Sequence, residues 1–205
     1  MRGSLPGQVH KTGPGGLSAE AFARWYRGEL AKAWDGLDLS AVAKAASAVL
    51  EARQAGRQVF TLGNGGSAAT ASHLATDLSK TAAVPGAPLV KCLALTDNTA
   101  YITAIGNDLS FDDIFSRQLE NILEAGDVVV LISGSGNSPN LIKAARLANA
   151  RGALTVGFLG FDGGRLKPLV RIPVLVASDQ YGVIEDVHMG VGHILTFFLK
   201  QLKQK

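Results

Sequence analysis

The chain has 205 residues, of which 47% are hydrophobic and 18% are charged, and its formal net charge is +3. This length is enough for one α/β domain with a substantial core, and so low a charge content suggests that part of the surface is covered in an oligomer. No apolar run is long enough to cross a bilayer, so a membrane is excluded as a partner. The basic residues are scattered without an aromatic-interleaved stripe, which argues against nucleic acid.

The cysteine content points to a reducing compartment. Cys92 is the one cysteine, so no disulfide can form within the chain, and a cytoplasmic location is expected. Because Cys92 lies in an apolar stretch, we expect it to be a small buried hydrophobic residue.

The chain begins with residues 1–16, which are rich in glycine and proline and are predicted to form a flexible leader. Residues 17–205 are predicted to form one domain that opens with two helices, the first starting near Ser18 and the second covering about 40–55. Strands then follow at 58–62, 91–95, 128–132, 155–159 and 170–176. Further helices are expected at about 67–80, 99–105, 111–124, 138–151 and 183–203, with a short one beginning near Gly163.

These strands are continuous apolar runs, which is typical of parallel strands covered on both faces. Together with the strand–helix alternation, they predict a doubly wound (flavodoxin-like) α/β fold: a three-layer sandwich with a central parallel sheet of about five strands.

Two glycine- and serine-rich turns each follow a predicted strand and precede a predicted helix. They are 63–67 (Gly-Asn-Gly-Gly-Ser) and 133–138 (Ser-Gly-Ser-Gly-Asn-Ser). Such a turn directs backbone N–H groups and hydroxyls at one point, and the helix adds the positive end of its dipole. Neither turn fits the dinucleotide or the nucleoside-triphosphate fingerprint. The pair therefore predicts a site for a small phosphorylated ligand, the alternative being two ordinary tight turns.

Histidines and carboxylates recur on two of the predicted helices. His73 and Asp77 are four residues apart and share one helix face, while Glu185 and His193 are eight apart on the last helix and project to one side. These residue types indicate a metal site or an acid–base pair. The alternative is a set of separate polar residues with local partners.

Several motifs taken in order resemble one family, the phosphoheptose isomerases, also called sedoheptulose 7-phosphate isomerases, which have the SIS fold. The resemblance covers about residues 20–200 and rests on 63–69 with the following His73, 104–108, 111–118, 126–128, 132–138 and 162–164. It implies an aldose–ketose isomerase that converts sedoheptulose 7-phosphate to a heptose 7-phosphate through an enediolate. It also implies a homotetramer and a divalent metal, zinc above all, that stabilises the enediolate.

The turns and the resemblance together assign the site residues. The expected phosphate and sugar contacts are Asn64, Gly65, Gly66, Ser67, Thr96, Asp97, Ser133, Gly134, Ser135 and Ser138. The resemblance implies that the metal ligands are His73, Asp77, Glu185 and His193. Its implied catalytic groups are Asp77, Glu185 and His193, and which of the two carboxylates is the base stays open.

The sequence departs from the family pattern at three of these places. Asp77 stands where the family usually has a glutamate base, Glu185 where it has a glutamine ligand, and Thr81 where it has a positively charged residue. Shortening the carboxylate arm at position 77 by roughly 1.5 Å shifts the reach of the base, which depends on hydrogen-bond distance. These changes hint at a different sugar phosphate.

Two other function classes are weighed against the enzyme. One is a non-catalytic family member that binds a replication initiator protein, and the other is a sensor of sugar phosphates. The first is disfavoured because both histidines and both acids are retained, and the second because 205 residues leave no room for a fused DNA-binding module.

Overall fold

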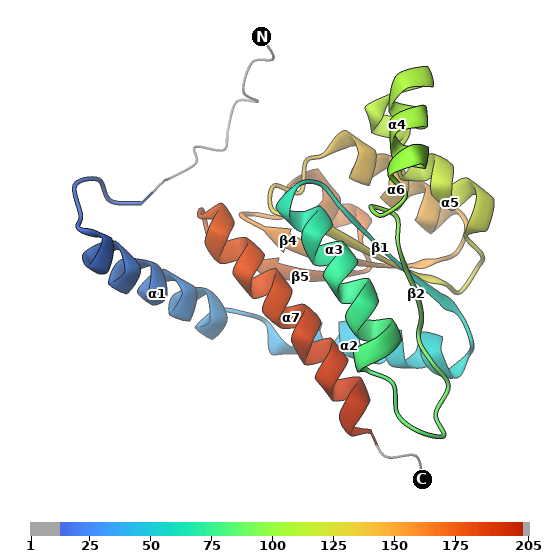
Figure 1. The fold of residues 1–205 in the computed structure, drawn as a ribbon, viewed down its shortest axis with the longest axis horizontal. Helices are drawn as coiled ribbons and strands as arrows, with labels where there is room; N and C mark the ends of the chain where they lie inside the picture. The colour runs from blue at the N-terminus through green and yellow to red at the C-terminus, as the bar shows by residue number, and fades with distance from the viewer. Residues whose placement is uncertain (1–12, 203–205) are drawn as a thin grey trace.

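Five parallel strands form the central sheet in the order β2-β1-β3-β4-β5 (Figure 1). The structure is a computed structural model that describes residues 13–202. The strands are β1 (Gln58–Gly63), β2 (Lys91–Ala94), β3 (Val128–Ser133), β4 (Leu154–Gly160) and β5 (Ile172–Val176). This is the flavodoxin-like order, so the predicted fold class is confirmed.

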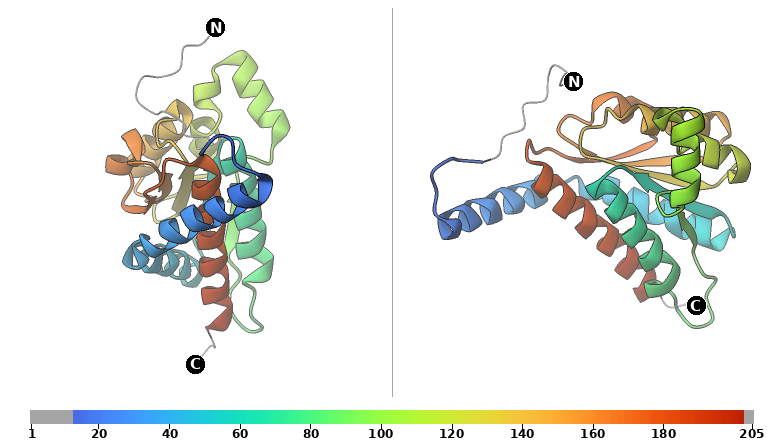
Figure 2. Two further views of the ribbon diagram at one scale, coloured as in Figure 1. Left: turned by 90° about the vertical axis from the view of Figure 1, so that its left-hand side faces the viewer. Right: turned by 45° about the horizontal axis from the view of Figure 1, so that its top comes forward.

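Helices cover both faces of the sheet (Figures 1 and 2). One hydrophobic core joins the sheet to α1 (Ala19–Asp35), α2 (Leu39–Gln54), α3 (Gly66–Thr76) and α7 (Tyr181–Gln201). A second core joins the opposite face to α4 (Thr99–Asp108), α5 (Ser116–Ile122) and α6 (Pro139–Ala150). In β3, Val128 and Val130 belong to the first core and Val129 and Leu131 to the second. This alternation is why the strand is apolar from Val128 to Ile132.

Most predicted elements are found within a few residues, and the exceptions have local causes. The helix expected at 111–124 is divided into a 3₁₀ turn, η2 (Phe111–Asp113), followed by α5. The short helix after Gly163 is also a 3₁₀ element, η3 (Gly164–Leu169), and it delays the start of β5 to Ile172. Pro173 is compatible with β5 because this is an edge strand.

The other edge strand, β2, is not covered on both faces. Leu93 is 43% exposed, while Cys92 is only partly buried, packs against the first core and carries a free thiol. The prediction that every strand is fully covered was therefore wrong for β2. Burial of the sulfur raises the pKa of the Cys92 thiol to about 12, which keeps it in the uncharged form.

The first helix begins as predicted and then leaves the body of the molecule. The Ser18 hydroxyl caps α1 by accepting a hydrogen bond from the Ala21 N–H at 3.3 Å. The carboxyl-terminal part of α1 packs on α7, where Tyr26 donates a hydrogen bond to Asp186 at 2.7 Å. The amino-terminal part projects from the sandwich as an arm (Figure 2). Residues 1–12, which are most of the predicted leader, lie outside the described residues.

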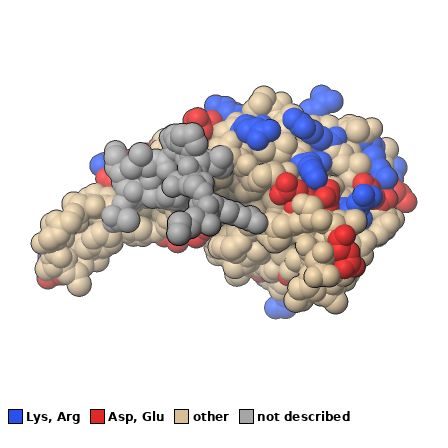
Figure 3. Space-filling model, turned by 90° about the horizontal axis from the view of Figure 1, so that it is seen from above, with Lys and Arg blue, Asp and Glu red and all other residues tan. Residues whose placement is uncertain are grey.

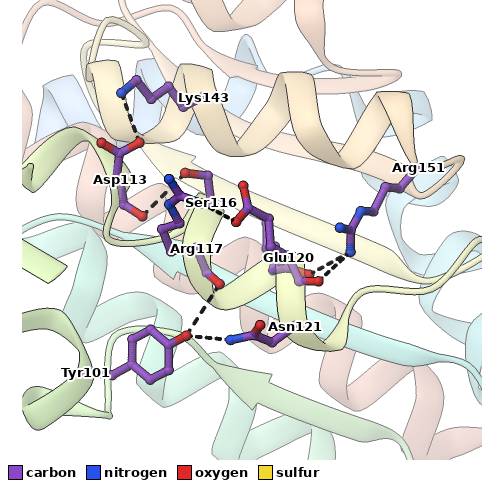
Figure 4. A network of polar contacts seen from close by, with 9 residues as sticks. Tyr101, Asp113, Ser116, Arg117, Glu120, Asn121, Lys143 and Arg151 are labelled. Atoms are coloured by element: carbon purple, nitrogen blue, oxygen red, sulfur yellow. Dashed lines mark hydrogen bonds and ion pairs between the residues drawn. The ribbon is translucent and has the colours of Figure 1, made fainter. Parts of the chain in front are cut away.

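Polar contacts join α4, α5 and α6 at the second face of the sheet (Figure 4). Lys143 of α6 forms an ion pair with Asp113 at 2.9 Å. Arg151 donates to the Glu120 carbonyl at 2.7 Å near the end of α5, where a cation also complements the helix dipole. Asn121 donates to the hydroxyl of Tyr101 at 2.5 Å, which ties α5 to α4.

Within residues 13–202, no helix is both long and apolar enough to cross a membrane. On the face drawn in Figure 3, the Lys and Arg side chains have Asp and Glu side chains beside them.

A histidine lies in the core of the first face. His188 of α7 is fully buried against Phe158, with ring centroids 6.0 Å apart, and neither ring nitrogen has a hydrogen-bond partner among the described residues. Burial lowers the pKa of His188 to about 4, and the Leu159 backbone opposes this only in part. The folded protein therefore holds the imidazole neutral, whereas the unfolded chain protonates it near pH 6.5.

His188 should make the protein sensitive to acid. The unfolded state binds the proton at a higher pH than the folded state does. The contribution of His188 to the unfolding free energy is therefore fully present above about pH 6.5 and is lost as the pH decreases toward 4. From pH 7 to pH 4.5 the wild type should therefore lose about 2–3 kcal/mol more unfolding free energy than His188→Met does. Urea denaturation at both pH values measures this difference. The control is Thr196→Val, a buried α7 substitution that removes no titrating group and should shift both values equally. Equal pH dependence of His188→Met and the wild type would contradict the prediction.

Candidate functional site

A polar hollow of about 140 Å³ lies at the carboxyl ends of β1 and β3. The chain leaves β1 toward β2 on one side and returns to β3 on the other, so this is the point where the strand order reverses. Open α/β sheets bind their ligands at such points. The hollow is lined by Asn64, Ser67, Ile132, Ser133, Gly134, Ser135, Ser138, Leu141, Tyr181 and Glu185.

Both glycine–serine turns therefore meet in one place, as the sequence predicted. Gly65 has φ +57°, a conformation that favours glycine, and it starts α3 directly at the hollow. Gly134 is required for a different reason, because a methyl group there would lie 2.6 Å from Cε1 of Tyr181. The backbone thus comes close to the aromatic ring that covers the second turn.

Internal hydrogen bonds hold the two turns in shape. Ser133 Oγ accepts from the Gly136 N–H at 3.0 Å, and Ser135 Oγ accepts from the Asn137 N–H at 3.2 Å. The hydroxyl hydrogen of Ser133 is thus not needed for its bond to Gly136 and can be donated to a ligand. Ser138 is the N-cap residue of α6 and makes no side-chain cap bond.

A pair of amides links the first turn to α6. Asn64 and Asn140 exchange two hydrogen bonds, each of 3.0 Å, and Asn140 is buried. Asn64 therefore lines the hollow, as expected, but its amide already has a protein partner. Its contribution is to position the turn against the start of α6.

A second group of polar residues lies farther along α3 and α7. These two helices run side by side in the same direction (Figure 1). Nε2 of His73 is 3.2 Å from Nε2 of His193 and 3.3 Å from Oδ2 of Asp77, and Nε2 of His193 is 3.9 Å from the same carboxylate oxygen. Both imidazoles are about half exposed, while Asp77 is mostly covered.

Asp77 is held by an unusual backbone feature. α3 continues into a π-helical turn, η1 (Asp77–Thr81), a feature often found at functional sites. The hydroxyl of Thr81 donates to Asp77 Oδ1 at 3.0 Å. This bond leaves Oδ2 as the oxygen that faces the two histidines. Thr81 thus orients the carboxylate, which the sequence did not reveal.

The donor set of this cluster fits a zinc ion. It offers two imidazole nitrogens and one carboxylate oxygen, which all lie within 4.8 Å of one another. Ligands about 2.0–2.1 Å from a tetrahedral zinc lie roughly 3.3 Å apart, close to the shorter separations observed here. His73, Asp77 and His193 could hold such an ion and leave the fourth position open.

Glu185 is not part of this cluster, so the four expected ligands do not all lie together within one chain. Residues eight apart on a helix share a side, but they are separated by about 12 Å along its axis. Glu185 therefore lies beside the start of α3 and lines the hollow, whereas His193 lies two turns farther on. Burial raises the pKa of the Glu185 carboxyl, and the charge of Asp186 adds to this effect.

Four of the predicted contacts do not line the hollow: Gly65 and Gly66 at the start of α3, and Thr96 and Asp97, which follow β2. Ser72 of α3 donates to Asp97 and lies 3.0 Å from the hydroxyl of Thr96. Thr96 and Asp97 therefore contact the residue that precedes His73, on the side of α3 that faces β2.

Sequence reasoning missed three residues that shape the site, Ser72, Asn140 and Tyr181, and it identified Thr81 only as a departure from the family pattern. Each of these residues acts through a partner distant in sequence or through the π turn, and a local sequence pattern predicts neither kind of contact. Tyr181 had a weak signal, since an aromatic residue that starts the last helix lies at the carboxyl edge of the sheet.

Comparison with known proteins identifies the family of the chain. A family model described as the SIS domain matches residues 26–160. The phosphoheptose isomerase of Trichlorobacter lovleyi is 41% identical over 162 residues, which cover 78% of this chain and 81% of that protein. The chain belongs to the phosphoheptose isomerase family. The predicted family resemblance is therefore confirmed.

Solved structures of the phosphoheptose isomerase family have the same fold. The phosphoheptose isomerase of Neisseria gonorrhoeae matches with a TM-score of 0.81 and 30% identity, over 89% of this chain and 97% of that one. The phosphoheptose isomerase of Francisella tularensis matches with a TM-score of 0.82 and 27% identity, over 89% and 96% of the two chains.

Proposed function

We propose that the protein is an aldose–ketose isomerase of a phosphorylated sugar, with sedoheptulose 7-phosphate as the ketose and a heptose 7-phosphate as the aldose. The observation that carries this proposal is the pairing of a serine-lined hollow with a His–Asp–His cluster on the same two helices. Membership of the phosphoheptose isomerase family supports the choice of sugar.

The phosphate is proposed to bind in the hollow. Ser67, Ser133, Ser135 and Ser138 would donate hydrogen bonds to its oxygens, and the amino-terminal end of α3 would add the partial positive charge of its dipole. The seven-carbon chain would then extend along α3 and α7, so that its C1–C2 end lies at the second cluster.

Proton transfer is proposed to occur at the Asp77 carboxylate. Asp77 would take the proton from C1 of the ketose, and the electron pair of the broken C–H bond would form the enediolate. The same carboxylate would return the proton to C2, while His193 moves a proton from the C1 oxygen to the C2 oxygen. Glu185 is the less suitable base because it lies at the hollow, about two helical turns from His193.

His73, Asp77 and His193 would hold a divalent metal, with zinc the best match to the donor set. When bound, such an ion supplies a Lewis acid that polarises the substrate carbonyl. Thr81 would keep the Asp77 carboxylate oriented toward the histidines.

The serines can be tested by binding. Ser133→Ala combined with Ser135→Ala should weaken the binding of sedoheptulose 7-phosphate at least tenfold, since hydrogen bonds to charged groups contribute about 1.5–3 kcal/mol each. Titration calorimetry measures the affinity. Ser79→Ala is the matched control because its hydroxyl bonds to the Cys92 carbonyl, outside the hollow. Unchanged affinity in the double variant would refute the proposed phosphate site.

The metal can be tested by composition as well as by activity. The purified protein should contain about one zinc or other first-row ion per chain, and a chelator should remove both the ion and the isomerisation seen by NMR. His193→Ala should lose metal measured by atomic spectroscopy, because one of three ligands is missing. Asp113→Asn, which disrupts only an ion pair with Lys143, should retain it. Full isomerisation in excess chelator would mean that the cluster acts as acid–base groups alone.

The protein is further proposed to be a homotetramer. The arm of α1 leaves Phe22 37% exposed, and α7 exposes Ile194 and Phe197 beside His193. Exposed apolar side chains of this size are typical of surfaces that contact another subunit, and a neighbouring subunit there would also enclose the half-exposed histidines.

Light scattering should report four times the chain mass of 21.4 kDa. Phe197→Glu should shift the assembly toward smaller species, because it places a charge in an apolar contact. Leu89→Glu, an equally apolar and exposed position on the loop before β2, is the control and should leave the mass unchanged. A wild-type protein that is monomeric at micromolar concentration would contradict the prediction.

A further inference from the structure

The carboxylate of Glu185 lies where an incoming phosphate would compete with it. Its side chain lines the hollow together with Ser67, Ser133, Ser135 and Ser138. A methyl group on Gly66 would be only 2.5 Å from Glu185 Oε2, so the carboxylate packs directly on the first residue of α3. The amino-terminal end of a helix is where a negative charge is most strongly stabilised.

No cation compensates for this charge in the hollow. Among the described residues that line it, none is lysine or arginine. The nearest ionisable neighbour on α7 is Asp186, another acid, which together with burial raises the pKa of Glu185. The α3 terminus and the serine hydroxyls are thus the groups near Glu185 that can stabilise an anion, and they are the same groups that a phosphate needs.

We infer that Glu185 is an internal competitor for the phosphate position: its carboxylate occupies the anion site of the free protein, and a phosphorylated ligand must displace it to bind. This inference rests on the proposed function, because it concerns the phosphate end of that site. Two negative groups within a few ångströms repel each other strongly in a partly buried site. The ligand therefore binds with the side chain of Glu185 turned away from Gly66.

The experiment compares anion binding in three proteins without any metal. Inorganic phosphate is titrated by calorimetry, in a buffer with chelator, into the wild type, Glu185→Gln and Asp186→Asn. Glu185→Gln keeps the size of the side chain and removes its charge, so phosphate should bind about tenfold more tightly or better. Asp186→Asn removes a charge one residue away that is hydrogen-bonded to Tyr26, and its affinity should stay within about twofold of the wild type.

A second variant tests whether the gain in phosphate affinity comes from the lost charge or from altered folding. Glu185→Ala should show the same gain as Glu185→Gln, and both should keep the wild-type melting temperature within a few degrees.

Phosphate binding by Glu185→Gln that equals or falls below that of the wild type would overturn the inference. If in that case the paired Ser133 and Ser135 substitutions still abolish binding, the proposed phosphate site stands. If neither the wild type nor Glu185→Gln binds phosphate and no sugar phosphate is isomerised, both the inference and the proposed function fail.

Discussion

The parallel pairing of β1 with β3 is the constraint on which the site depends. Gly63 is in register with Ile132, so the two strands end at the same edge of the sheet although they are about 70 residues apart in sequence. Both strands lie in the middle of the sheet, with β3 fully buried and β1 nearly so. Their hydrogen-bond ladder therefore cannot slip without exposing apolar side chains. This register brings two glycine–serine turns and two helix starts to one hollow.

The packing of α3 on α7 then extends the site away from the sheet. Leu74 of α3 and Gly192 of α7 lie at this contact, because a methyl group on Gly192 would be at van der Waals distance, 3.4 Å, from Leu74. Since the helices run in the same direction, their first turns meet at the hollow, and residues about two turns farther along each helix meet at the His–Asp–His cluster. One elongated ligand can thus have its charged end held at the hollow and its reacting end held at the cluster.

The polar residues divide between these two places according to the helical rise. Glu185 and His193 project to the same side of α7, yet each belongs to a different group because two turns separate them. The surroundings also differ in charge. The hollow offers neutral donors and a helix terminus, where an anion is stabilised, whereas the cluster offers nitrogen and oxygen ligands suited to a cation.

The sequence by itself determined the fold class, the two turns and the family, because these follow from local signals. A continuous apolar run ending in glycines predicts a buried strand and a tight turn wherever the run occurs. Only the tertiary structure decided which polar side chains meet. The exposure of β2 follows from its place at the edge of the sheet, and the orientation of Asp77 follows from a π turn and Thr81. The separation of Glu185 from the histidines depends on how α3 lies on α7, since residues sharing a helix face still lie at different heights along its axis.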